Sequence, residues 1–101
     1  MKSAQSLSDF FDAIDSDGRI STTHIGLYAA ILHYWRLQDF KIPFFAYSYD
    51  IMKIAKVSAR VTYVRCIRDL HQFGYLKYEP SFKRNRASKI WVSQPEPALK
   101  N

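Results

Sequence analysis

The sequence predicts a mainly α-helical domain with one small β-hairpin near its C-terminal end. Three observations support this fold class. Residues 6–73 carry apolar side chains at helical spacing, in segments that begin at serine or threonine. After Gly74 the period changes, because residues 75–79 and 89–93 alternate between polar and apolar side chains. The 101 residues, of which 48% are hydrophobic, suffice for one core.

The N-terminal part predicts two helices. Residues 6–14 form a short amphipathic helix that begins at Ser6 or Ser8, and the DSDG sequence after it is typical of a turn. A longer helix is expected over about residues 21–38, with apolar side chains over so wide an arc that it packs on more than one side. The expected apolar stripes consist of Phe10, Phe11 and Ile14 in the first helix, and Leu27, Ala30, Ile31, Tyr34 and Trp35 in the second.

Two further helices are expected in quick succession after Pro43, which interrupts the long helix. Residues 44–47 predict a short strand or an extended connector. Ser48 is expected to cap the next helix and Ser58 the one after it, with only KVS between them. Gly74 suits the left-handed position that ends a helix. The inward-facing residues are expected to be Ile51, Ile54 and Ala55 in the first of these helices, and Val61, Val64, Ile67 and Leu70 in the second.

The alternating segments predict two strands that pair as a hairpin. One face of this hairpin is expected to carry Leu76, Tyr78, Ile90 and Val92. A basic loop, SFKRNRASK, bridges the strands; it holds four positive charges and contains neither an acid nor a glycine.

The charges are distributed unevenly along the chain, whose net charge is +6. Residues 1–40 contain three basic and five acidic residues, whereas residues 41–101 contain twelve basic and four acidic ones. Such asymmetry favours binding of a polyanion to the C-terminal part. A solvated basic surface that only aids solubility is the alternative.

The stretch from Ser48 to Val92, and above all VTYVRCIRDLHQFGYLKYE, resembles a winged helix-turn-helix domain: two helices with a tight connection, then a hairpin called the wing. The resemblance covers about residues 22–93 and is to small bacterial transcriptional regulators and to N-terminal domains of replication initiators of phages and mobile elements. It implies a winged-helix domain (21–93). Residues 1–20, an expected N-terminal helical extension, lie outside the resemblance, and the polar, proline-bearing residues 94–101 are expected to form a mobile C-terminal tail. The wing loop departs from the simplest form, because it is long and lacks glycine.

The resemblance implies duplex DNA binding, with the second helix in the major groove and the wing at the backbone or the minor groove. The expected role is transcription regulation, or an accessory role in replication or recombination of a mobile element. Arginine suits guanine or phosphate because its planar fork donates two hydrogen bonds together. Arg65 and Arg68 are expected to flank the contact, Lys53 and Lys56 to bind the DNA backbone, and Phe82 to stack or wedge. The candidate DNA-binding residues are Ala59, Arg60, Thr62, Tyr63 and Arg65 in the helix, and Lys83, Arg84, Arg86 and Lys89 in the wing.

Two other functions stay open. The same fold can serve as a protein–protein interaction module. It can also bind single strands or RNA by stacking, although the aromatic residues fit a core better. A homodimer through the N-terminal helices is a further hypothesis. The aromatic residues weighed for stacking are Tyr28, Tyr34, Trp35, Phe44, Phe45 and Trp91, and those weighed for dimerisation are Phe10, Phe11 and Trp35.

The sequence favours neither an enzyme nor a metal or cofactor site. His24, His33, His71 and Cys66 lack zinc-site spacing, and the DAIDSDGRIS segment lacks both end ligands of a calcium loop. One cysteine excludes a disulfide within the chain. No apolar run approaches the ~20 residues of a membrane span. A cytoplasmic location is therefore expected.

Overall fold

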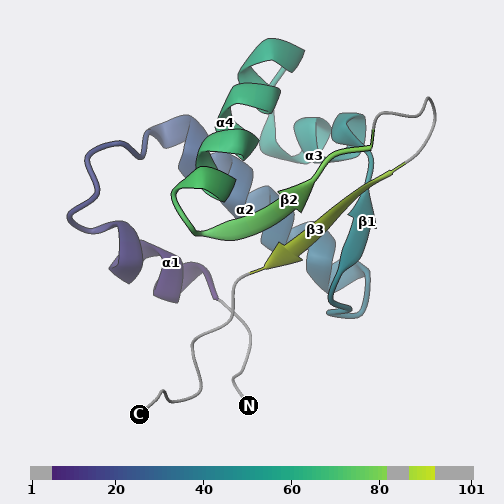
Figure 1. Cartoon of the computed structure of the whole chain (residues 1–101), viewed down its shortest axis with the longest axis horizontal. Coiled ribbons are helices and arrows are strands. Elements are labelled where there is room, and N and C mark those ends of the chain that lie inside the picture. The colour runs from purple at the N-terminus through teal and green to yellow at the C-terminus, as the bar shows by residue number, and fades with distance from the viewer. Residues whose placement is uncertain (1–5, 82–86, 93–101) are drawn as a thin grey trace.

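The computed structural model describes residues 6–81 and 87–92 (Figure 1). Within them the chain forms four helices and one three-stranded antiparallel sheet, which confirms a mainly helical fold with a small β component. None of the helices in these ranges has the length and apolar character needed to cross a membrane. The elements are α1 (Leu7–Ile14), α2 (Thr22–Leu37), β1 (Phe44–Ala46), α3 (Ser48–Ala55), α4 (Arg60–Gln72), β2 (Leu76–Glu79) and β3 (Ser88–Val92).

The sheet has the order β1-β3-β2, so the predicted hairpin gains a third strand along β3. Leu76 pairs with Val92 between β2 and β3, and Phe44 pairs with Ile90 between β1 and β3. The predicted apolar side of the hairpin is confirmed, because Leu76, Ile90 and Val92 are buried. In Figure 1, α2 and α3 lie behind the sheet, and the other side of the sheet faces the viewer.

The two N-terminal helices begin where the sequence predicts. Ser6 caps α1, and its hydroxyl accepts a hydrogen bond from the backbone N–H of Asp9 at 3.0 Å. Ser21 caps α2 in the same way, with His24 as the residue that reaches back to the cap backbone. Both starts are set by side chains three residues apart, which is why local sequence suffices to find them.

The predicted caps of α3 and α4 are wrong. Ser48 is already the first residue of α3, and Tyr47 occupies the cap position without a side-chain hydrogen bond. The Ser48 hydroxyl instead accepts a hydrogen bond from the guanidinium of Arg60. Ser58 stands one residue before the cap of α4, Ala59, which cannot donate or accept through its side chain.

The predicted inward face of α4 is partly wrong. Val61 is 77% exposed, whereas Tyr63 and Cys66 are buried with Ile67 and Leu70. Each step of three residues along a helix rotates the side-chain direction by about 300°. Three such steps leave a net rotation of half a turn. Val61 and Leu70, the first and fourth residues of the predicted run, therefore point in opposite directions. The buried residues instead follow the i, i+3, i+4, i+7 pattern of one helix face.

Tyr63, a predicted DNA contact, does not lie on the exposed side of α4. Its side chain is only 2% exposed and belongs to the core. Burial raises the pKa of its hydroxyl above the usual range, since the charged form would be desolvated.

The N-terminal helix α1 contributes to the same core as the rest of the chain. The ring of Phe10 stacks on Tyr28, with 3.9 Å between centroids, and meets the ring of Tyr75 edge-on at 5.4 Å. Trp35 is also buried, and its indole N–H donates to the carbonyl of Lys41 at 3.0 Å. Phe10 and Trp35, two residues weighed for dimerisation, thus belong to the core, and neither ring is exposed.

The predicted DSDG turn is tied to the turn between α4 and β2. Asp17 accepts hydrogen bonds from the Tyr75 hydroxyl at 2.6 Å and from Arg19 Nε at 2.8 Å. These bonds, that of Arg19 above all, hold the pKa of the Asp17 carboxyl well below its usual range. The Arg19 guanidinium also lies 3.9 Å from the ring centre of Phe73.

Gly74, directly after the end of α4, has a φ of 90°, which confirms the predicted left-handed position.

Candidate nucleic-acid interface

One exposed stripe runs along α4, opposite its buried face. Val61, Arg65 and Arg68 stand four and three residues apart, so they project from the same side of the helix, and all three are exposed. Val61 is absent from the predicted site. The sequence did contain a signal for it, because it lies opposite the i, i+3, i+4, i+7 set that fills the core. With 13 residues, α4 is roughly 20 Å long.

The start of α4 adds a second feature that favours anions. Ala59 and Arg60 are exposed there, and Thr62 is half-buried. The first turn contains no acidic residue and Ala59 provides no side-chain cap. The free backbone N–H groups of this turn, together with the positive end of the helix dipole, are therefore suited to a phosphate.

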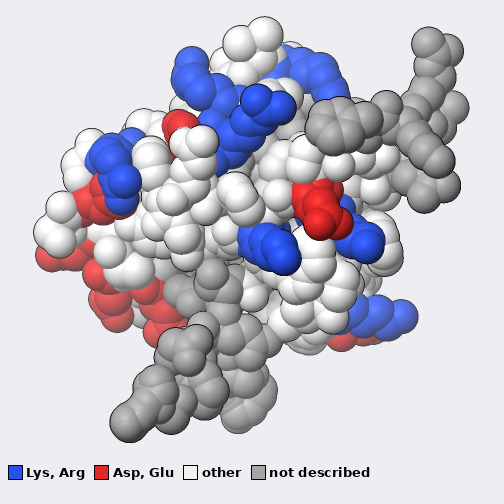
Figure 2. Space-filling model, in the orientation of Figure 1, with Lys and Arg blue, Asp and Glu red and all other residues white. Residues whose placement is uncertain are grey.

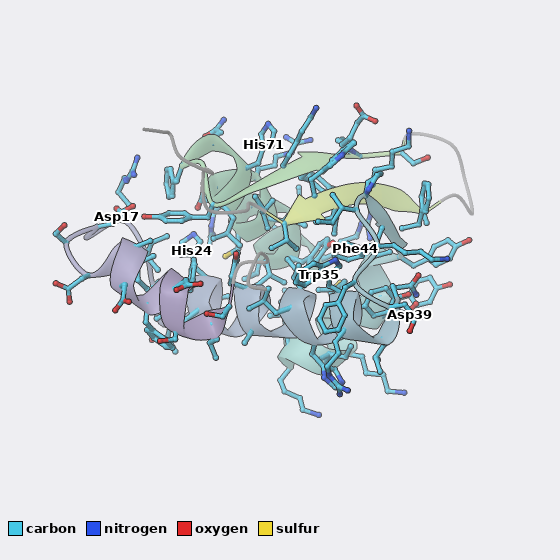
Figure 3. All side chains as sticks on the ribbon, turned by 90° about the horizontal axis from the view of Figure 1, so that it is seen from below. Asp17, His24, Trp35, Asp39, Phe44 and His71 are labelled. Atoms are coloured by element: carbon cyan, nitrogen blue, oxygen red, sulfur yellow. The ribbon has the colours of Figure 1, made fainter. Side chains whose placement is uncertain are left out.

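A partly buried series of hydrogen bonds holds α4 against α2. His24 Nε2 lies 2.8 Å from Asp69 Oδ2, and the backbone N–H of Ser21 donates to His24 Nδ1 at 2.9 Å. Since Nδ1 accepts, Nε2 carries the proton and donates to the carboxylate. Figure 3 labels His24 at the same end of the molecule as Asp17.

Ser21, His24 and Asp69 are the residue types of a catalytic triad, but Ser21 and His24 have the geometry of a helix cap. The Ser21 hydroxyl accepts from the backbone N–H of His24 at 3.4 Å, as in a capping box. The two hollows described below have none of these three side chains in their walls. The Ser21 hydroxyl also lies 2.8 Å from His24 Nδ1, and these contacts together tie the start of α2 to Asp69 of α4.

The predicted wing can be placed only at its base. Lys83, Arg84 and Arg86, like Phe82, lie outside the described residues. Lys89 lies in β3, with its Nζ 3.9 Å from Glu79 Oε1 and its side chain 44% exposed.

The uneven distribution of charges along the sequence is also found on the surface of the folded protein. Lys and Arg side chains gather over α4 in the upper part of Figure 2, whereas Asp and Glu gather over α1 and the loop after it at the lower left. Lys53 of α3 and Lys56 directly after it, the predicted backbone contacts, are exposed as well.

The outer face of the sheet carries aromatic rings and charges. Phe45 pairs with Lys89, which pairs with Glu79, and in the next row Lys77 pairs with Trp91. Phe45 is 50% exposed, although the sequence interpretation favours a core position for it. A hollow of about 320 Å³ adjoins this face. Its walls are formed by Phe45, Glu79, Pro80, Ser81, Ala87 and Lys89.

A second hollow, of about 430 Å³, lies between the start of α1 and the end of α2. Its walls include Leu7 and Phe40, which are 38% and 55% exposed, as well as Leu32. Of the three residues weighed for dimerisation, Phe11 is the exposed one: its exposed fraction on α1 is 47%.

The described residues contain no cluster of three or more side chains that could hold a metal ion. Cys66 is fully buried, which raises the pKa of its thiol. No known protein family, curated protein or solved structure matches the chain.

Proposed function

We propose that this chain is a bacterial winged helix-turn-helix protein that binds duplex DNA, with α4 in the major groove. The observation that carries the proposal is the exposed stripe of Val61, Arg65 and Arg68. This stripe lies on a helix that follows α3 after a short connection and leads directly into a hairpin. An α-helix with such side chains fits the ~12 Å width of the major groove.

Each part of the stripe suits a different contact. The guanidinium groups of Arg65 and Arg68 can donate two hydrogen bonds together to guanine or to phosphate. The methyl groups of Val61 suit the thymine methyl group. Arg60 and the first-turn N–H groups suit a phosphate at the groove edge, and Ser48 orients the Arg60 side chain for that contact.

The hairpin would act as the wing. Lys89 at its base and Lys83, Arg84 and Arg86 in its loop would bind phosphates or enter the minor groove. The biological role that fits best is transcription regulation, or an accessory role in replication or recombination of a mobile element. The protein would work in the cytoplasm, without a cofactor and without catalysing a reaction.

The test is fluorescence anisotropy with a labelled random duplex at several salt concentrations. The variant Arg65→Ala/Arg68→Ala removes two phosphate contacts, so the log–log salt slope becomes shallower by about 1.8. At 0.1 M salt, this change in slope corresponds to binding that is about 60-fold weaker in the variant. The matched control is Arg36→Ala/Lys41→Ala, which removes two exposed charges from the end of α2 and the loop after it.

The control variant is expected to bind nearly as well as the wild type. If both double variants lose the same affinity, net charge alone accounts for binding, and α4 is not the interface. If the wild type does not bind duplex at low salt, duplex binding itself is refuted.

The second hollow favours a protein–protein role as the alternative function. Leu7 and Phe40 line this hollow, and Phe11 is exposed four residues after Leu7 on α1, so a partner, or a second copy of this chain, can pack on these apolar side chains. A homodimer would place two α4 helices on half-sites about 34–36 Å apart. Sedimentation of the wild type and of Phe11→Asp separates these cases, because a dimer through this surface dissociates in the variant. A wild type that is monomeric at high concentration excludes the dimer.

A further inference from the structure

We propose that the outer face of the sheet is a second binding site, which takes single-stranded DNA by stacking unpaired bases on Phe45 and Trp91. This site is separate from α4, because β1, β2 and β3 alone supply its side chains. The choice of DNA rests on the proposed duplex function, since an unpaired strand next to a bound duplex is DNA.

The strand register brings the two rings together on one face. Phe45 is paired with Lys89, and Trp91 stands two residues further along the same strand as Lys89. Residues placed diagonally in this way on adjacent strands have Cα atoms about 7–8 Å apart. Neighbouring nucleotides of an extended strand can therefore reach both rings.

Phe45 occupies an exposed position on a strand whose other residues are buried. Phe44 and Ala46 on either side are each 1% exposed, whereas Phe45 is 50% exposed. Its ring borders the hollow of about 320 Å³, which lies at the small end of the usual size range of ligand pockets. A ring that served only the core would point to the other side of the sheet, where α2 and α3 lie (Figure 1).

Trp91 is half-buried, and Lys77 Nζ lies 4.6 Å from the centre of its ring. This cation–π contact is exposed and hence weaker than a base–aromatic stack. A base can displace the lysine side chain, whose ammonium group then remains close enough to bind the phosphate of the same nucleotide.

The charges of this face favour a polyanion. Lys77 and Lys89 oppose a single carboxylate, that of Glu79, which lies 3.9 Å from Lys89 Nζ. In Figure 2, blue and red side chains stand over β2 and β3 on the side that faces the viewer. Aromatic rings interleaved with cations are the pattern that binds single strands. A duplex does not present its base faces to such rings, because they are stacked on one another.

The experiment measures anisotropy of a labelled thymidine oligonucleotide of about 12 residues, beside a labelled duplex. Phe45→Leu keeps an apolar side chain but removes the ring, and is expected to weaken single-strand binding by about 5- to 10-fold. Phe45→Tyr keeps the ring and is expected to bind like the wild type. Both variants are expected to bind the duplex within about twofold of the wild type.

Two further readouts do not depend on loss of binding. Glu79→Gln removes the opposing charge and is expected to tighten single-strand binding by about two- to fivefold. Stacking on Trp91 quenches its fluorescence, and this quenching is expected to disappear in Trp91→Phe, which retains a ring.

The outcomes separate this inference from the duplex proposal. Unchanged single-strand binding in Phe45→Leu, or wild-type affinity in Glu79→Gln together with no quenching, overturns the sheet site whatever the duplex result. An RNA oligonucleotide that binds as tightly as DNA overturns the choice of DNA. If Phe45→Leu does not fold, the Glu79→Gln and quenching results decide. Failure of the Arg65→Ala/Arg68→Ala test alone refutes only the duplex site.

Discussion

Two tyrosines that flank the same phenylalanine are expected to respond in opposite ways to loss of the hydroxyl group. Tyr28 and Tyr75 both contact the ring of Phe10, one stacked and the other edge-on. The Tyr28 hydroxyl is buried and has no hydrogen-bond partner among the described residues. The Tyr75 hydroxyl donates to Asp17 at 2.6 Å. Tyr28→Phe is therefore expected to stabilise the protein, and Tyr75→Phe to destabilise it.

The size of the Tyr28 effect follows from its burial. The side chain is 0% exposed, and burial raises the pKa of its hydroxyl above the usual range. A buried hydroxyl without a partner costs about 1–3 kcal/mol in protein mutational data. Phenylalanine keeps the ring stack and removes this cost, so we expect a gain of about 1 kcal/mol. In a domain of about 100 residues, this gain raises the melting temperature by about 4 °C.

Urea unfolding followed by circular dichroism measures both variants under the same conditions. The two substitutions remove the same atom, so each serves as the control for the other, and equal m-values show that only stability has changed. If Tyr28→Phe lowers the free energy of unfolding, its hydroxyl is satisfied in solution and the reasoning is refuted.

Three more predictions concern the packing that positions α4, and urea unfolding checks each of them. Ile67→Ala is expected to cost about 2–5 kcal/mol, and Val61→Ala less than about 0.5 kcal/mol, since only the former residue is buried. Asp69→Ala leaves the N–H of its buried histidine partner unpaired, at an expected cost of about 1–3 kcal/mol. Hydrogen bonds, chiefly from Arg19, lower the pKa of Asp17, so the native state binds this proton less readily than the unfolded chain. Asp17→Asn is therefore expected to be less stable than the wild type at pH 7. The difference in the free energy of unfolding between the two proteins is expected to become smaller below about pH 4.

Local signals are sufficient to predict the first half of the fold. The caps at Ser6 and Ser21 bind groups three residues away, so the sequence around them determines where α1 and α2 begin. The end of α4 is equally local, because Gly74 adopts the left-handed conformation that the sequence predicts. The hairpin follows from strict alternation of apolar and polar residues.

Distant contacts account for what the sequence did not predict. The hydroxyl of Ser48 binds Arg60, twelve residues away, so Ser48 does not cap a helix. The third strand depends on pairing of Phe44 with Ile90, and this pairing also sends the side chain of Phe45 outward. The inward face of α4 was predictable in principle. However, Val61 and Val64 are three residues apart, and over a short helix this spacing resembles the apolar stripe of an inward face.

The two proposed sites have only Lys89 in common, and their placement on different elements bears on the biological role. The stripe on α4 would hold a duplex, whereas the sheet would hold an unpaired strand. Only a protein that acts where a duplex opens, as in replication or recombination, gains from both at once. A forked DNA with duplex and single-stranded arms is then expected to bind at least about tenfold more tightly than either arm alone, because the second contact becomes intramolecular. Phe45→Leu should abolish this gain and leave duplex affinity intact. If the fork binds no better than the duplex, transcription regulation is the better role, and the sheet site, if it binds single strands, works independently of α4.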